Sequence, residues 1–99
     1  ANHCPEGEFE LAVEQMAFAY GWIWYHTHRA QFSPAGFPDL VLVRPPRIVY
    51  AELKGYDSRS RRGQPTADQQ EWIELLLASG QDAGCYWPED WGLLEEKLR

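Results

Sequence analysis

The sequence has little of what is typical of secreted, membrane or zinc-finger proteins. It contains only two cysteines, Cys4 and Cys85, and no Cys-x-x-Cys pair, so we expect two free thiols in a reducing cytoplasm. No apolar run approaches the roughly 20 residues that span a bilayer, and no secretory signal is visible. There is no internal repeat and no linker, and 99 residues suffice for one domain (1–99) with one modest core.

Positive charge is also scarce, but it is concentrated in one segment. Nine Lys/Arg stand against fifteen Asp/Glu, and this net charge of −6 at first argues against a nucleic-acid partner. Seven of the nine basic residues lie between positions 29 and 62 with only three acids, so that segment is +4 and the remainder is −10. Such a basic centre can follow a phosphate backbone, although an arginine-rich solvated loop explains it equally well.

Hydrophobic periodicity predicts an α/β chain in the order helix, three strands, helix, strand, helix. The first helix runs from Glu6 to about Tyr20 and carries one apolar stripe, formed by Phe9, Val13, Met16, Ala17 and Tyr20. Strands are expected at 22–28, 41–43, 48–53 and 83–87. A second helix begins at Thr66, where Thr66-x-x-Gln69 matches a capping box. We expect its buried side to consist of Trp72, Ile73, Leu75, Leu76 and Leu77. Pro88 opens a terminal helix.

Two acids and a lysine fall within one predicted hairpin. Prolines interrupt strand pairing, so Arg44-Pro45-Pro46-Arg47 is the turn. If its two arginines lie opposite each other, the register places Asp39 opposite Glu52, where like charges repel. Glu52 and Lys54 are two residues apart and share a face. A divalent metal is the natural counter-ion for two adjacent carboxylates, whereas the plain alternative is a charged, solvated hairpin.

Other titratable residues are weaker candidates. Of the four glutamates on the first helix, Glu6 is aimed most nearly at the protein body, although it also suits the helix dipole in the first turn. His26 and His28 share a strand face with the spacing of a two-histidine metal site. Without a recognisable third ligand, we favour surface or substrate contact for both.

Four blocks in this order resemble a known family: a helix with an early Glu6, Gly36-Phe37-Pro38-Asp39, Ala51-Glu52-Leu53-Lys54 and Gln69-Gln70-Glu71-Trp72. They resemble the VRR-NUC branch of the PD-(D/E)XK nuclease superfamily, particularly its small stand-alone phage and bacterial members. The resemblance implies a restriction-endonuclease-like αβββαβ core, with a mixed central sheet flanked by helices, and here a C-terminal helix. It also implies an Mg²⁺- or Mn²⁺-dependent DNA endonuclease in the cytoplasm of a bacterial or phage-infected cell.

The resemblance also assigns roles to residues. Asp39 and Glu52 would bind the metal, helped by the Leu53 carbonyl, and Lys54 would orient or activate the attacking water. Glu6 would complete the acidic cluster, with Glu10 as the alternative, and Gln69 would steady Lys54 or the substrate unless it serves only its capping box. The family pattern does not fix the DNA contacts, which we expect from the basic residues Arg59, Arg61, Arg62, His28 and Arg29.

Small members of this family resemble structure-selective nucleases such as Holliday-junction resolvases. The resemblance therefore implies cleavage of branched DNA, such as junctions or flaps, in DNA repair. A four-way junction has two equivalent strands to cut, so we predict a homodimer with two-fold symmetry. Two alternatives are a catalytically inactive nucleic-acid-binding module and a metal-free interaction domain.

Overall fold

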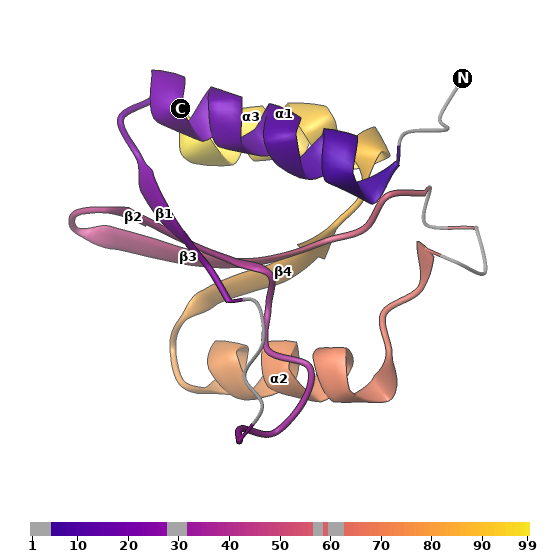
Figure 1. Cartoon of the computed structure of the whole chain (residues 1–99). Helices are drawn as coiled ribbons and strands as arrows, with labels where there is room; N and C mark the ends of the chain where they lie inside the picture. The colour runs from indigo at the N-terminus through magenta and orange to yellow at the C-terminus, as the bar shows by residue number, and fades with distance from the viewer. Residues whose placement is uncertain (1–4, 28–31, 57–58, 60–62) are drawn as a thin grey trace.

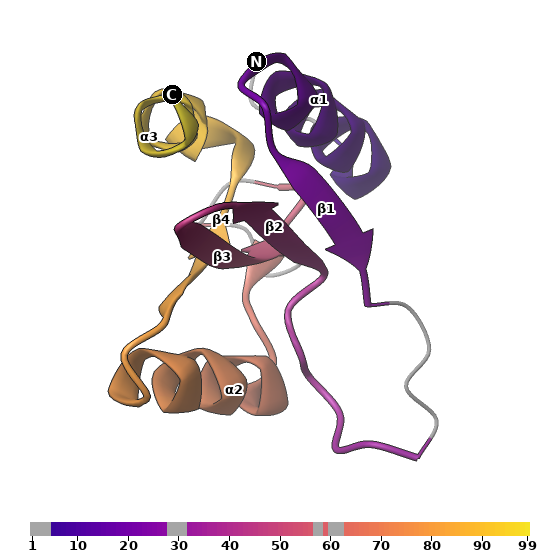
Figure 2. The ribbon, with the colours of Figure 1, turned by 90° about the vertical axis from the view of Figure 1, so that its left-hand side faces the viewer.

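A four-stranded sheet lies between two helical layers (Figure 1). The computed structural model describes residues 5–27, 32–56, 59 and 63–99. The elements are α1 (Glu6–Ala19), β1 (Ile23–His26), β2 (Leu40–Arg44), β3 (Arg47–Leu53), α2 (Ala67–Ala78), β4 (Asp82–Tyr86), the 3₁₀ turn η2 (Pro88–Asp90) and α3 (Trp91–Leu98). Helices α1 and α3 cover one face of the sheet, and α2 covers the other (Figures 1 and 2). This is the predicted α/β architecture, with its mixed sheet and C-terminal helix.

The sheet has the order β1-β2-β3-β4. Its first three strands are antiparallel, and β4 lies parallel to β3, as a crossover through α2 requires. Arg44 pairs with Arg47 across the turn, and the pairing continues to Leu40 and Ala51. One further step in the same register brings Asp39 opposite Glu52, so the predicted register is confirmed.

The core lies between the sheet and the layer of α1 and α3. The predicted stripe of α1 is observed, since Phe9, Val13 and Ala17 are buried and two other members pack against them. Trp22 is 1% exposed, and its indole N–H donates to the Leu98 carbonyl of α3 at 2.8 Å. Strand β1 therefore begins one residue later than predicted. The Trp22 side chain binds α3, and the pairing of β1 with β2 starts at Ile23.

Two of the basic residues in the arginine-rich segment serve the fold. The Arg44 guanidinium donates to the carbonyls of Tyr20 and Leu98 at 2.9 and 3.2 Å. Arg47 donates to the Lys97 carbonyl at 2.8 Å. Both guanidinium groups also lie over the Trp22 ring, 4.7 and 5.1 Å from its centre. The last carbonyls of a helix lack partners within it and carry negative partial charge, so these contacts anchor α3 to the hairpin.

Helix α2 begins with the predicted capping box of Thr66 and Gln69. Its predicted buried side is wrong at Leu75 and Leu77, whereas Trp72, Ile73 and Leu76 are half-buried. None of the residues of α2, all of which the structure describes, is buried, and Leu75 and Leu77 are more than half exposed. Since α2 lies by itself on its face of the sheet, part of its apolar stripe has no second element to pack against (Figure 2).

Candidate active site

Asp39 is held at the start of β2 by the strands on both sides. Its Oδ2 accepts a hydrogen bond from the backbone N–H of Leu53 at 3.0 Å, beyond the last paired residues of β2 and β3. Its own carbonyl accepts from the backbone N–H of Thr27, after β1, at 3.1 Å. The carboxylate therefore has a fixed position at the edge where β2 begins and β3 ends.

Glu52 and Lys54 lie beside Asp39 and are both withdrawn from solvent. Glu52 is 2% exposed, and its Oε2 is 3.4 Å from the Lys54 Nζ. Its Oε1 is buried and accepts no hydrogen bond from any residue that the structure describes. Lys54 is 8% exposed, and its backbone N–H donates to the Tyr86 carbonyl of β4 at 2.9 Å.

Gln69 brings α2 to the same place. Its side-chain oxygen accepts a hydrogen bond from the Lys54 ammonium at 2.8 Å. The same oxygen accepts from the backbone N–H of Thr66, also at 2.8 Å. The two roles weighed for Gln69 therefore coexist, because the capping box fixes the amide that contacts Lys54.

Glu6 of α1 interacts electrostatically with Asp39 and Lys54. Partial burial raises the pKa of its carboxyl group, the Asp39 carboxylate raises it further, and Lys54 opposes both. A Cβ added to Gly55 would lie 2.6 Å from the Glu6 Cα. The chain after Lys54 thus passes directly against the start of α1 (Figure 1). Only glycine at position 55 leaves room for Glu6 to approach this closely.

The acids dominate the electrostatics of the site. Burial raises the pKa of Glu52 to about 8, the Asp39 carboxylate contributes next, and Lys54 acts in the opposite direction. Three carboxyl groups share one ammonium, so a divalent cation is the counter-charge that would allow all three to be ionised together. Cys85 pairs with Glu52 in the sheet, and burial followed by this carboxylate raises its pKa to about 12. Its thiol therefore stays protonated and is no nucleophile.

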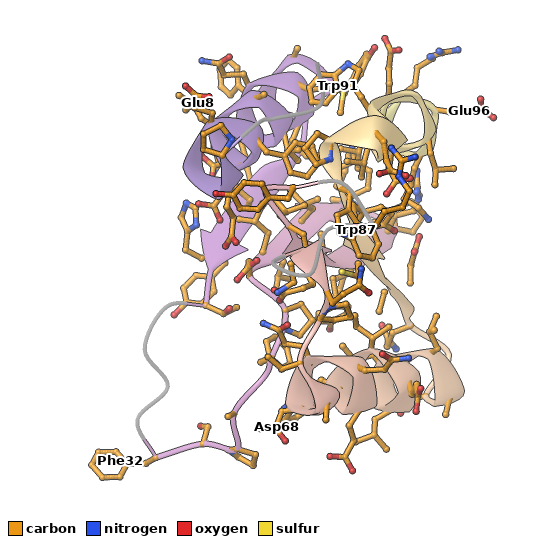
Figure 3. The ribbon with its side chains drawn as sticks, turned by 90° about the vertical axis from the view of Figure 1, so that its right-hand side faces the viewer. Glu8, Phe32, Asp68, Trp87, Trp91 and Glu96 are labelled. Atoms are coloured by element: carbon orange, nitrogen blue, oxygen red, sulfur yellow. The ribbon has the colours of Figure 1, made fainter. Side chains whose placement is uncertain are left out.

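The loop that delivers Asp39 is fastened to α2. Gly36 has a φ of +98°, and an added Cβ would lie 2.7 Å from the Asp68 carbonyl oxygen; Figure 3 shows Asp68 at the start of α2. The Phe37 ring meets the rings of Trp72 and Tyr50 edge-on, with centroids 5.0 and 5.9 Å apart. The half-buried Trp72 thus packs against this loop, and the glycine and phenylalanine before Pro38 position the acid.

Of the five residues expected to contact DNA, the structure describes only Arg59. Arg59 is exposed, whereas Arg61, Arg62, His28 and Arg29 lie outside the described residues, so their roles stay predictions. The metal-binding role of the Leu53 carbonyl also stays a prediction. The chemical roles of the converging side chains are likewise expectations that their positions support.

A second group of ligand-type side chains was missed in the sequence. Glu10, the alternative to Glu6, lies with Glu14 and His26, where α1 passes over β1. The helical i, i+4 spacing of the two glutamates was the available signal. The sequence alone does not show that His26 of β1 lies beside these two glutamates.

Comparison with solved structures agrees with the fold. One solved structure, described as a VRR_NUC domain, superimposes with a TM-score of 0.66 over 81% of this chain and 81% of its own, at 21% sequence identity. The chain therefore has a VRR-NUC fold. No protein-family model and no curated protein sequence matches it. Within the described residues, every helix is too short or too polar to cross a membrane.

Proposed function

We propose that this chain is a metal-dependent DNA endonuclease that hydrolyses phosphodiester bonds. The observation that carries the proposal is the convergence of Asp39, Glu52 and Lys54 at one sheet edge, with the ammonium held between Glu52 and Gln69. Phosphodiester hydrolysis needs acids beside a lysine. Here these groups lie on a fold that is shared with a VRR_NUC domain. The phosphodiester is anionic and repels hydroxide, so positive charge must be supplied at both the water and the phosphate.

The residues present fit a hard divalent cation. Asp39, Glu52, Glu6 and the Leu53 carbonyl offer oxygen ligands only, which suit Mg²⁺ or Mn²⁺. The buried Glu52 Oε1 accepts no hydrogen bond from the described residues, and an ion would satisfy it. The ion, when bound, lowers the pKa of a coordinated water and shields the phosphate oxygens.

Lys54 and Gln69 act on the substrate side of the site. The Lys54 ammonium is largely buried, so its attraction for a phosphate oxygen is screened less than at the surface. Gln69 fixes the direction of the ammonium through the 2.8 Å contact. In this proposal Lys54 orients the attacking water and offsets the charge that develops on the phosphate, while Gln69 is a positioning residue.

Branched DNA and a dimer complete the proposal. The enzyme acts in the cytoplasm, in DNA repair, on junctions or flaps, as a homodimer whose two sites meet two strands. An exposed apolar surface on α1 and β1 supports self-association: Leu11, Phe18, Ile23 and Tyr25 are each more than half exposed. β1 is also an edge strand, with no further strand beside it in the described chain.

Cleavage assays test the activity. Labelled four-way junctions, flaps, splayed arms and plain duplexes are incubated with Mg²⁺, Mn²⁺ or EDTA. We expect cutting of branched substrates with either ion and none with EDTA. Lys54→Ala should lower the cleavage rate at least about 100-fold and leave DNA binding largely intact, whereas Asp39→Asn should remove both ion binding and cutting.

The matched control is Glu96→Gln, which changes an exposed acid on α3 (Figure 3) and should cut like the parent. Salt-sensitive DNA binding without cleavage under any ion would contradict the endonuclease and favour the inactive binding module. Light scattering tests the dimer, since Phe18→Glu should yield monomers if the apolar surface is the interface. A parent protein that is monomeric at assay concentration refutes that part of the proposal.

A further inference from the structure

Three ligand-type side chains lie together outside the candidate active site, where α1 passes over the edge strand β1. Glu10 and Glu14 are one helical turn apart on α1, and His26 is the last residue of β1. One ligand atom from each lies within 4.8 Å of the other two. The closest pair is His26 Nε2 and Glu14 Oε2 at 3.0 Å, and His26 Nδ1 lies 3.8 Å from Glu10 Oε2.

The geometry of Glu14 points to a missing partner. Its Oε2 is shielded from solvent and accepts no hydrogen bond from any described residue, even though the imidazole is so close. The two atoms are therefore close but not aligned as a hydrogen bond. Around a tetrahedral ion with bonds of about 2.0–2.2 Å, neighbouring ligand atoms lie about 3.4 Å apart. Shifts of roughly an ångström would therefore bring all three atoms onto one ion.

We propose that Glu10, Glu14 and His26 form a second metal site, which takes Zn²⁺ or a similar first-row transition ion. An imidazole nitrogen with two carboxylates suits zinc and its neighbours, while magnesium prefers oxygen ligands alone. Three protein ligands leave one position for water, which the partial exposure of His26 permits. This site is separate from the proposed nuclease ion and does not depend on it.

The placement of the site indicates what a bound ion does. His26 pairs with Leu40, and the next residue, Thr27, donates its backbone N–H to the Asp39 carbonyl. An ion joining α1 to the end of β1 would fasten the edge strand at the point that supports Asp39. Its role is therefore structural, and its binding should raise the melting temperature.

Binding to the full chain tests the proposal. Asp39→Asn and Glu52→Gln are combined to disable the nuclease site, and Co²⁺ or Zn²⁺ is titrated by calorimetry and visible absorption. We expect about one equivalent with nitrogen–oxygen ligation, a raised melting temperature and no competition from Mg²⁺. Adding His26→Gln or Glu14→Gln should weaken binding at least about 100-fold and cancel the thermal shift.

The control is Glu8→Gln, which changes an exposed acid on α1 and should bind as the background does. Circular dichroism confirms that each variant is folded, and either of the two ligand variants suffices for the test. Absence of Zn²⁺ and Co²⁺ binding overturns the proposal and leaves an ion-paired histidine only. Binding that survives both His26→Gln and Glu14→Gln overturns it equally. Neither result bears on cleavage with Mg²⁺, so failure here and failure of the nuclease proposal remain distinguishable.

Discussion

On one face of the sheet α1 and α3 bury Phe9, Val13 and Leu94 almost completely, whereas on the other face α2 contributes no buried residue. A hollow between α2 and β4, lined in part by Ile73, Leu77 and Trp87, accompanies this thin packing. Buried apolar area is the main source of folding free energy. The layer of α1 and α3 therefore stabilises the fold, and α2 is held by its cap, its aromatic contacts and Lys54.

The candidate active site lies where the two layers meet at one sheet edge. Glu6 comes from the well-packed layer, Gln69 comes from the thin one, and the sheet supplies the remaining side chains. The residues that stabilise the fold and those of the candidate site therefore come largely from different parts of the molecule. Substitutions in the buried side of α1 should act on folding, and substitutions at the start of α2 should act on activity.

The largest expected effect is on folding. Phe9→Ala should lower the free energy of unfolding by about 3–5 kcal/mol, because it leaves a cavity in the core. Leu77→Ala, on the thin side, should cost less than about 1 kcal/mol. Urea denaturation measures both. A large loss for Leu77→Ala would contradict the thin packing of α2 and indicate that a second subunit covers this helix in solution.

The next effect is a pH dependence that originates at Glu52. Its folded pKa is about 8 against an ordinary value of 4.5, so the folded protein holds this proton more tightly than the unfolded chain. Its contribution to stability is full below pH 4.5 and is lost as the pH rises through 8. Without divalent ions, the melting temperature should fall over this range more steeply than in Glu52→Gln.

Added Mg²⁺ should reverse this fall at high pH, because a metal binds the deprotonated carboxylate. Thermal melts of both proteins from pH 5 to pH 9, with and without the ion, provide the measurement. Parallel curves for the parent and Glu52→Gln would show that Glu52 does not hold its proton in the folded state.

The smallest effect separates the two functions of Gln69. Thr66→Ala and Gln69→Ala each disturb the capping box and should each cost about 1 kcal/mol of stability. Only Gln69→Ala removes the acceptor of the Lys54 ammonium. It should therefore slow cleavage roughly tenfold more than Thr66→Ala does. Equal rates for the two variants would limit Gln69 to its cap.

The sequence was sufficient to predict those features that depend on neighbouring residues. The two prolines between Arg44 and Arg47 locate the turn, and the turn sets the register that brings Asp39 opposite Glu52. The stripe of α1 and the cap of α2 are likewise local patterns. The site was predictable because its central residues lie on one hairpin.

Features that depend on packing were not predictable in this way. The apolar pattern of α2 cannot reveal that no second helix covers its outer side, so Leu75 was wrongly expected in the core. Arg44 and Arg47 belonged by composition to a basic segment, yet they bind the end of α3. His26 meets Glu14 only because α1 crosses β1, and nothing in their spacing along the chain predicts it.

The hydrogen bond from the Lys54 backbone to Tyr86 has a consequence for how the protein is made. Ribosomes complete the hairpin with Asp39 and Glu52 well before they reach β4 and α3. Until Tyr86 and Leu98 emerge, Lys54 lacks its neighbouring strand and Trp22 lacks its anchor. In the proposed nuclease, the site around Lys54 would therefore be complete only after the last strand has joined the sheet.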